Sequence, residues 1–288
     1  MLKKFARKIA GSKISVIFKV LLTAAQLLHY RLLCLKWALI GKKRPTAGEI
    51  SYVVKNVTFI YKSFKRQKMA KRLFWNIQKY YPGAAVIIAD DSGVPLDVKS
   101  EYAKIITLPF NSGLSCGLNA ALTEVKTPYV MRLDDDELLT PYTDIGGQLD
   151  LLEQNENIDL VAVQACSALE GMRPKKAAEE YYEQTIKNAP KSLLIPHMTR
   201  LDDNRIVVAK SPNTFLARTE KLREVGYDNN IRMIDHHEFF FRAAGVITAC
   251  MDESAFVFHY HNRFDREYNK YRADYKKDLI YIREKHKP

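Results

Sequence analysis

The chain has 288 residues and a formal net charge of +12, but its excess of basic side chains is confined to the first 50 positions. Those positions carry 11 Lys and Arg against the single acid Glu49, whereas the other 238 residues carry 34 basic and 32 acidic side chains. The sequence therefore does not predict the basic groove across a folded body that nucleic-acid binding usually needs. The four cysteines are widely spaced, without a CxxC pair or a zinc-ligand pattern, which is typical of reduced thiols in the cytosol.

Residues 1–50 are expected to form a basic amphipathic segment and a linker. Lys13, Lys19, Arg31 and Lys36 interrupt each window of the roughly 20 apolar residues that a membrane-spanning helix needs. We therefore expect an interfacial helix on an anionic membrane, in the cytoplasm and peripheral on the inner face of the cell membrane. The alternative is a helix packed on the main domain or on a partner chain. The apolar stripe comprises Ile14, Ile17, Phe18, Leu21, Ala25, Leu28, Leu32, Leu35 and Leu39.

Residues 51–262 show the alternation of strands and helices that is typical of an α/β domain. Helices are expected to flank a mostly parallel sheet, whose ligands bind beyond the carboxyl ends of the strands. A linker over 42–48 precedes this domain, and a basic helix over 263–288 follows it. The expected strands cover 53–61, 84–89, 104–109, 128–133, 159–165, 205–210, 213–218 and 255–260. The expected helices cover 66–81, 113–125, 144–155, 176–187, 220–225 and 235–244, with a polar acceptor-side or lid region over 170–200.

Two acidic clusters follow expected strands. Asp134, Asp135 and Asp136 come after the strand 128–133, and Asp90 and Asp91 come after the strand 84–89. Adjacent carboxylates repel one another, and a divalent cation such as Mn²⁺ or Mg²⁺ offsets that repulsion. The alternative is a solvated acidic turn that caps the next helix. Because both clusters lie at strand carboxyl ends, the sequence favours a site for a metal and a nucleotide.

A nucleotide-sugar donor would use these groups in separate ways. Its diphosphate leaves with two negative charges and needs a divalent cation, for which Asp136 is the candidate ligand. Asp134 and either Asp90 or Asp91 are the candidates for contacts to the nucleoside. His259 and His261 alternate along a strand and so share one side, where one of them could complete the metal shell. A structural role is the alternative for each histidine.

The attacking hydroxyl of the acceptor needs a general base, and Glu238 is the candidate. It lies in the run His236-His237-Glu238-Phe239-Phe240, where aromatic neighbours are expected to raise the pKa of its carboxyl by desolvation. The alternative is a surface glutamate that pairs with Arg242, four residues further on.

Several runs, in this order, resemble the inverting GT-A glycosyltransferases of the family 2 type, and among them the β-1,4-N-acetylgalactosaminyltransferases. The likeness covers roughly residues 51–262, and it implies a UDP-sugar donor, Mn²⁺ bound at the Asp-rich motif and a base at Glu238. Its implied donor contacts also include Thr58, Asn119 and Asp135. One departure is Leu118-Asn119, where the family often has Arg-Asn, which puts one donor contact in doubt. The runs are Val57-Thr58-Phe59, residues 86–92, 108–119 and 129–136, and then 213–218, 225–228 and 237–240.

The predicted function is an inverting, metal-dependent transfer of a sugar (GalNAc, GlcNAc, Gal or Glc) from a UDP-sugar. The acceptor would be a cell-surface glycan or a lipid-linked molecule, such as those of lipopolysaccharide or capsule. One alternative is a non-catalytic scaffold with a degenerate glycosyltransferase fold in a polysaccharide-assembly complex, which Leu118 favours. Another is a nucleotidyltransferase, although the stretch 61–66 lacks the glycine expected of a phosphate loop.

Overall fold

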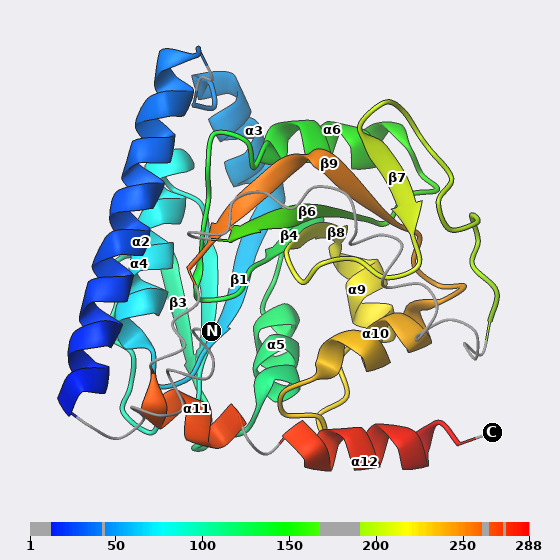
Figure 1. Cartoon of the computed structure of the whole chain (residues 1–288). Coiled ribbons are helices and arrows are strands. Elements are labelled where there is room, and N and C mark those ends of the chain that lie inside the picture. Colours follow the sequence, from blue (N-terminus) through cyan, green and yellow to red (C-terminus); the bar gives the residue numbers. More distant parts are fainter. Residues whose placement is uncertain (1–12, 42–43, 168–190, 261–264, 273–274, 288) are drawn as a thin grey trace.

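A computed structural model of the chain describes residues 13–41, 44–167, 191–260, 265–272 and 275–287. Within these ranges, nine strands form one sheet with helices on both faces (Figure 1). The strands are β1 (Val57–Ser63), β2 (Val86–Asp90), β3 (Ala103–Thr107), β4 (Tyr129–Arg132), β5 (Glu137–Leu138), β6 (Leu160–Ser167), β7 (Arg205–Val208), β8 (Phe215–Arg218) and β9 (Ala249–His259). The helices are α2 (Lys13–Leu39), α3 (Ala47–Asn56), α4 (Gln67–Tyr80), α5 (Leu114–Thr123), α6 (Ile145–Gln154), α9 (Thr219–Val225), α10 (Asp235–Ala243), α11 (Arg266–Arg272) and α12 (Tyr275–Lys285).

The strand order is β3-β2-β1-β4-β8-β6-β9-β5, and β7 pairs with β9. The first four strands in this order, β3, β2, β1 and β4, are parallel to one another, which confirms the predicted α/β architecture. Beyond β4 the sheet is mixed, because β8 runs antiparallel to both β4 and β6, while β9 is parallel to β6 and antiparallel to β5 and β7. The carboxyl ends of β1, β2 and β4 therefore meet at one edge of the sheet, where ligands of such folds bind.

The start of the domain differs from the prediction of a strand over 53–61. Residues 47–56 form α3, which a capping box begins. Thr46 Oγ1 accepts from the backbone N–H of Glu49 at 3.3 Å, and Glu49 Oε2 accepts from that of Thr46 at 2.6 Å. The β-branched residues near Val53 suggest a strand, but two satisfied backbone donors and the burial of Val53 favour the helix. The segment expected to be a linker thus ends as the first turn of α3.

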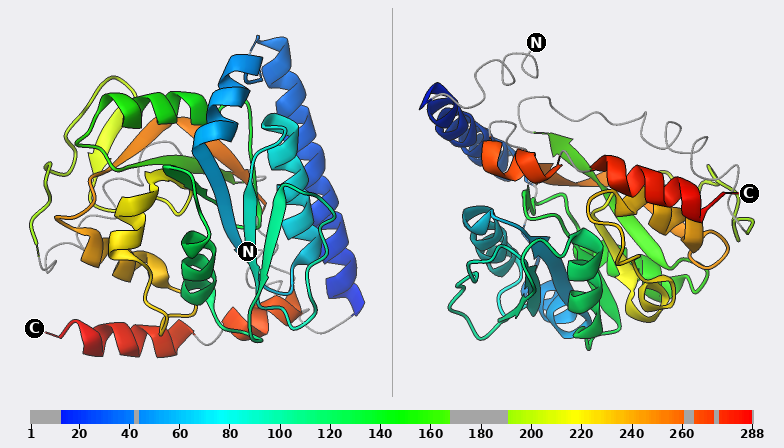
Figure 2. Two further views of the ribbon diagram at one scale, coloured as in Figure 1. Left: turned by 180° about the vertical axis from the view of Figure 1, so that it is seen from behind. Right: turned by 90° about the horizontal axis from the view of Figure 1, so that it is seen from below.

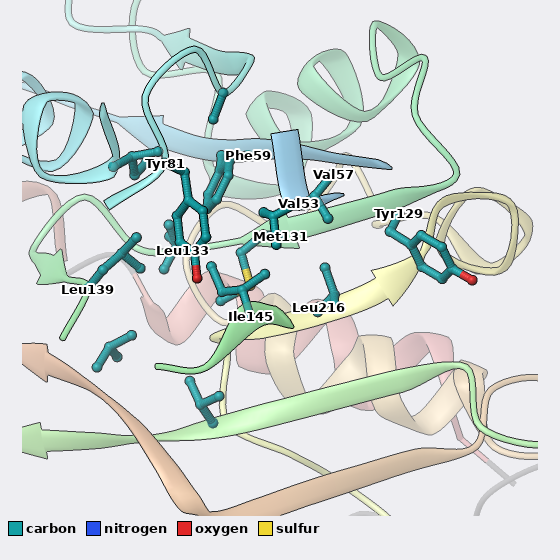
Figure 3. Close-up of a cluster of buried hydrophobic side chains, with 14 of the residues drawn as sticks. Val53, Val57, Phe59, Tyr81, Tyr129, Met131, Leu133, Leu139, Ile145 and Leu216 are labelled. Carbon is teal, nitrogen blue, oxygen red and sulfur yellow. The ribbon is translucent and has the colours of Figure 1, made fainter. Parts of the chain in front are cut away.

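Two apolar cores lie on opposite faces of the sheet. One is built with α3, α4 and α6, the other with α5, α9 and α10. Along β1, Phe59 belongs to the first core and Ile60 to the second, as the alternation of a strand requires. Figure 3 shows Val53 of α3 and Ile145 of α6 beside Met131 of β4 in the first core. Full burial of such a side chain contributes about 1.5–3 kcal/mol, so α3 is part of the main domain.

Helix α2 lies along the outside of the domain beside α4 (Figures 1 and 2). It packs on the body through Gln26, Tyr30 and Trp37, which are buried. Tyr30 donates a hydrogen bond to the carbonyl oxygen of Leu139 at 2.7 Å, and the Trp37 ring contacts that of Phe256. The predicted helix is therefore confirmed, with one face packed against the protein.

The opposite face of α2 is apolar and exposed. Val16–Leu39 is long and apolar enough to cross a membrane by length and composition, and an 18-residue window of it holds no more than two charged side chains. Lys19, Arg31 and Lys36 interrupt this stretch as expected, but they are few enough that the helix fits a membrane span by length and composition as well as the predicted interfacial helix. The exposed apolar side chains include Ile14, Ile17, Leu21, Leu28, Leu32, Leu35 and Leu39.

The C-terminal region, predicted as one basic helix, contains α11 and α12, which lie along one side of the domain near α5 and α10 (Figure 2). Asp278 of α12 is buried, and its Oδ2 accepts hydrogen bonds from three consecutive backbone N–H groups, those of Arg232, Met233 and Ile234. The last helix therefore fixes the segment that precedes α10. The helix expected over 176–187 lies outside the described residues.

Candidate active site

A cavity of about 600 Å³ opens at the carboxyl ends of β1 and β4. Its lining comes from the loop after β1, the acidic turn after β4, the segment before α10, and helix α11. We call it the donor pocket. The side chains that bring charge or hydrogen-bonding groups to it include Lys62, Arg66, Asp134, Asp135, Asp136, Asn213, Arg232, His259 and Tyr268.

The three predicted aspartates reach this pocket together because a tight turn follows β4. Glu137 closes the turn: its backbone N–H donates to the carbonyl oxygen of Asp134 at 3.1 Å, and its Oε2 accepts from the N–H of Asp134 at 2.9 Å. Burial and the nearby charge of Asp134 raise the pKa of Glu137 to about 8. Asp134 is left with its side chain 36% exposed toward the pocket.

Arg66, the N-cap residue of α4, neutralises the other two aspartates. Its Nη1 lies 2.8 Å from Asp136 Oδ2, its Nε lies 3.2 Å from Asp135 Oδ2, and its Nη2 contacts Asp135 Oδ1. The guanidinium also lies 4.0 Å from the ring centroid of Tyr268 in α11. Burial outweighs the attraction of Arg66 and raises the pKa of Asp135 to about 7. Asp135 is thus buried in an ion pair within the pocket wall.

His259 completes this cluster of charges. The pairing of β5 with β9 places it opposite Glu137, and its Nε2 lies 3.5 Å from Asp136 Oδ1. Burial alone would lower the pKa of His259, but the hydrogen bond and charge of Asp136 raise it to about 9. The imidazole is therefore protonated near neutral pH and would have to lose that proton to bind a metal. His261 lies outside the described residues.

The acidic side chains of the pocket suit a cation that binds together with a diphosphate. Among the residues that the structure describes, no three His, Cys, Asp or Glu side chains are grouped as a complete metal site. Mg²⁺ is usually held by only one or two carboxylates together with substrate phosphates. Asp134 and Asp136 can supply those carboxylates, provided that Arg66 yields its contact with Asp136.

A buried pair that was not predicted lies behind the pocket wall. Arg132 is fully buried, and its Nη2 lies 3.2 Å from Asp235 Oδ2 and 4.0 Å from Asp134 Oδ1. Its Nη1 donates to Asn213 Oδ1 at 2.9 Å. Burial raises the pKa of Asp235 to about 6, although Arg132 opposes the shift. A carboxylate at the first position of α10 is thus connected through one guanidinium to the acidic turn.

Glu238 lies one turn further along α10 and does not line the donor pocket. Its carboxylate is buried in ion pairs with Arg242 at 2.7 and 2.9 Å and with Lys285 at 2.7 Å. Burial raises the pKa of Glu238, but the hydrogen bonds from Arg242 and Lys285 outweigh it and the net shift is downward. The expectation of a raised pKa is therefore wrong. The pairing with Arg242 that was the alternative is present, although in a buried setting.

Asp90 and Asp91 shape the pocket from behind. Asp90 accepts hydrogen bonds from Ser92 and from the backbone N–H of Leu96. Asp91 accepts from the N–H of Gly113 at 2.9 Å and pairs with Lys62 Nζ at 2.7 Å. Both aspartates are buried, and it is Lys62 and Gly113 that line the pocket.

Two other expected donor contacts lie elsewhere. Thr58 is at the amino end of β1, the opposite end of the strand from the pocket, where Thr127 donates a hydrogen bond to it. Asn119 of α5 joins that helix to the loop before α10: its Nδ2 donates to the carbonyl oxygen of Tyr227, and its Oδ1 accepts from the N–H of the same residue. The structure therefore gives both side chains structural contacts away from the donor pocket.

Sequence reasoning missed Lys62, Arg66 and Asn213, together with Tyr268 and Tyr271 of α11. Arg66 and Tyr268 are separated by about 200 positions in the sequence, and only the fold brings their side chains together. The one local signal was the place of Arg66 at the start of the helix predicted over 66–81.

Comparison with known proteins agrees with this architecture. The model of the glycosyl transferase family 2 matches residues 58–226, which is more than half of the chain and includes the acidic turn. Over 229 residues the chain is 32% identical to the β-1,4 N-acetylgalactosaminyltransferase 2 of Mus musculus, covering 76% of this chain and 44% of that protein. Over 201 residues it is 33% identical to the β-1,4 N-acetylgalactosaminyltransferase 1 of Homo sapiens, covering 68% of this chain and 38% of that one.

The chain thus spans less than half the length of these curated relatives. Among solved structures, residues 1–349 of TarS from S. aureus share the fold, with a TM-score of 0.50 and 15% identity over 71% of this chain and 60% of that one. A longer TarS structure has a TM-score of 0.51 and 15% identity, over 76% of this chain and 38% of that one. Because the family model matches more than half of its residues, the chain belongs to the glycosyl transferase family 2.

Proposed function

We propose that this chain is an inverting, divalent-metal-dependent glycosyltransferase that moves a sugar from a UDP-sugar to a glycan or glycolipid. The observation that carries the proposal is the joint presence of Asp134 and Asp136 with Lys62, Arg66 and Arg232 in one pocket of about 600 Å³. Carboxylates for a cation and basic groups for a diphosphate are what such a donor requires. The names of the curated relatives favour N-acetylgalactosamine as the sugar.

The residues of the pocket have separate tasks in this reaction. A bound Mn²⁺ or Mg²⁺, held by Asp136 and Asp134, would offset the charge that develops on the departing diphosphate. Lys62, now paired with Asp91, and Arg66, now paired with Asp135 and Asp136, are the cations placed to face the same phosphates. Tyr268 covers Arg66 from α11 and would limit the access of water.

The acceptor hydroxyl attacks the anomeric carbon on the side opposite the diphosphate. The new C–O bond forms as the bond to the phosphate oxygen breaks, and the hydroxyl proton passes to a carboxylate base. Helix α10 carries two buried carboxylates, Asp235 and Glu238. The sequence favours Glu238, and neither carboxylate lines the donor pocket directly. The geometry favours Asp235, because Arg132 joins it to Asp134 and to the pocket-lining Asn213, and because its pKa is about 6. A carboxyl with that pKa is ionised at neutral pH and still basic enough to accept a proton.

We further propose that the enzyme works on the inner face of the cell membrane. The exposed apolar side of α2 supports this location, since an apolar face of that length is costly to leave in water. An acceptor at the membrane surface would then lie near the donor pocket.

The test is the release of UDP from UDP-GalNAc, UDP-GlcNAc, UDP-Gal and UDP-Glc, measured with Mn²⁺, with Mg²⁺ and with EDTA. We expect release with metal only, and its loss in Asp136→Ala. Asp97→Ala, which changes an exposed acid in a loop, is the matched control. Release in EDTA, or full activity of Asp136→Ala, would refute the metal assignment. Failure of the wild type to bind UDP with Mn²⁺ would favour the non-catalytic scaffold.

A further inference from the structure

A second cavity, of about 550 Å³, lies between α2 and α4. Lys19 and Thr23 line it from α2, and Lys68, Met69 and Arg72 line it from α4. We call it the α2–α4 cavity. Arg66 lines both this cavity and the donor pocket, so the two spaces share a wall.

The lining of the α2–α4 cavity is strongly basic. Among the described residues that line it, Asp265 is the only acid, and Lys19 pairs with it at 2.7 Å. Lys68 and Arg72 are four residues apart and so lie on one side of α4. Neither of them is paired with a carboxylate in the part of the chain that the structure describes, although Arg72 lies 5.1 Å from the ring centroid of Tyr260. The cavity therefore offers positive charge to a ligand that is not part of this domain.

The start of α4 adds to the positive electrostatic potential of the cavity. Its N-cap residue, Arg66, makes no side-chain capping hydrogen bond, and its first turn contains no acidic residue. The N-terminus of a helix bears a partial positive charge and exposes backbone N–H groups, which suits a phosphate. Two basic side chains, an uncapped helix start and a cavity of sufficient size thus point to the same kind of ligand.

The position of the cavity relative to α2 indicates where this ligand comes from. Ile17 and Leu21 are 57% and 58% exposed on the outer side of the same turns whose inner side carries Lys19 and Thr23. An interfacial helix buries its apolar face at the boundary between headgroups and acyl chains. A helix is about 10 Å across, so the polar side of α2 would then lie at the depth of the lipid phosphates.

We infer that the α2–α4 cavity binds the phosphate of an anionic phospholipid in the membrane on which α2 lies. This inference rests on the proposed membrane attachment but not on the proposed sugar transfer. Because Arg66 separates the two cavities, the bound lipid phosphate would lie next to the donor pocket. The lipid would thereby orient the pocket toward acceptors in the membrane plane.

The experiment measures co-sedimentation of the full chain with vesicles of phosphatidylcholine alone and of phosphatidylcholine mixed with phosphatidylglycerol. The test variant is Lys68→Glu/Arg72→Glu, and the control is Lys71→Glu/Lys79→Glu, which makes the same charge change on α4 outside the cavity. We expect phosphatidylglycerol to strengthen binding of the wild type and the control. The test variant should lose at least about tenfold in affinity for the mixed vesicles, because it reverses two of the charges that attract the anionic surface.

An equal loss in the control variant would show a general effect of charge and overturn the site. An undiminished response of the test variant to phosphatidylglycerol would do the same. Tight binding of soluble glycerol phosphate that only the test variant loses would overturn the lipid assignment in favour of a free anion. UDP release without vesicles should be unchanged in both variants, so a failure of the lipid site is distinguishable from a failure of the proposed enzyme.

Discussion

Arg66 Nη1 lies 2.8 Å from Asp136 Oδ2, so an arginine is paired with the carboxylate that we propose as a metal ligand. The same guanidinium binds Asp135, and all three side chains are largely buried. Buried carboxylates need a countercharge, and here Arg66, the N-cap residue of α4, supplies it. Binding of a metal and a diphosphate would therefore be an exchange of cations around Asp136, not the filling of a preformed metal site.

This exchange predicts the behaviour of Arg66→Gln. Loss of the guanidinium removes the competitor for Asp136, so the affinity for Mn²⁺ in the absence of nucleotide should rise by about tenfold or more, as expected when a neighbouring cation is removed from a carboxylate. Isothermal titration calorimetry measures it. Arg72→Gln, on the next turn of α4, should leave the affinity unchanged because Arg72 does not contact the acidic turn. Equal affinities in wild type and Arg66→Gln would show that Arg66 does not compete with the metal.

The pH dependence of turnover distinguishes the two candidate bases. A base acts when deprotonated, so with Asp235 as the base kcat/KM should fall below pH about 6, the pKa to which burial raises this carboxyl. With Glu238 as the base, whose pKa is lowered below its ordinary value, kcat/KM should stay level to at least about pH 5. We expect the first profile, measured as UDP release over pH 4.5–8 (roughly the range that brackets both groups).

The matching variants are Asp235→Asn and Glu238→Gln. The first should lose about 10²–10⁴-fold in kcat, as expected for removal of a general base, while binding UDP normally. The second should keep kcat within about tenfold of the wild type but melt at a lower temperature, since Arg242 and Lys285 lose their buried partner. The reverse pattern would return the role of base to Glu238.

Asp278 predicts a link between the last helix and the donor pocket. Asp278→Ala leaves the N–H groups of Arg232, Met233 and Ile234 without their acceptor, which should cost about 1–3 kcal/mol of unfolding free energy. Because Arg232 and Met233 line the pocket, KM for the UDP-sugar should also rise. Chemical denaturation and steady-state kinetics measure the two effects. Glu284→Ala, an exposed change on the same helix, should show neither, and a rise in KM there would contradict the explanation.

The exposed side of α2 predicts the effect of Leu28→Glu/Leu32→Glu. Both side chains are more than half exposed, so the variant should fold as the wild type does but lose flotation with membranes by at least about tenfold, given the cost of burying charge in the bilayer. Leu279→Glu/Ile280→Glu on α12 makes the same change on another exposed surface and should float normally. Deletion of residues 1–44 is a poorer test, because Tyr30 and Trp37 pack on the body. Normal flotation of the α2 variant would refute the membrane role of this face.

The sequence by itself determined the parallel strands β1 to β4, because buried parallel strands are short apolar runs between recognisable helices. It also placed Asp134, Asp135 and Asp136 at a strand end, where a ligand site is expected. The local sequence pattern gave the wrong secondary structure at α3, where β-branched residues suggested a strand but a capping box and core packing favoured a helix.

The tertiary structure alone decided the environment of each charge. Glu238 is adjacent to aromatic residues in the sequence, which suggested a raised pKa, but hydrogen bonds from Arg242 and from Lys285 of the last helix outweigh the effect of burial and shift the pKa downward. Asp136 pairs with Arg66, which is 70 positions away in the sequence. Electrostatic interactions depend on distance in space and on burial, and neither quantity is contained in the order of the residues.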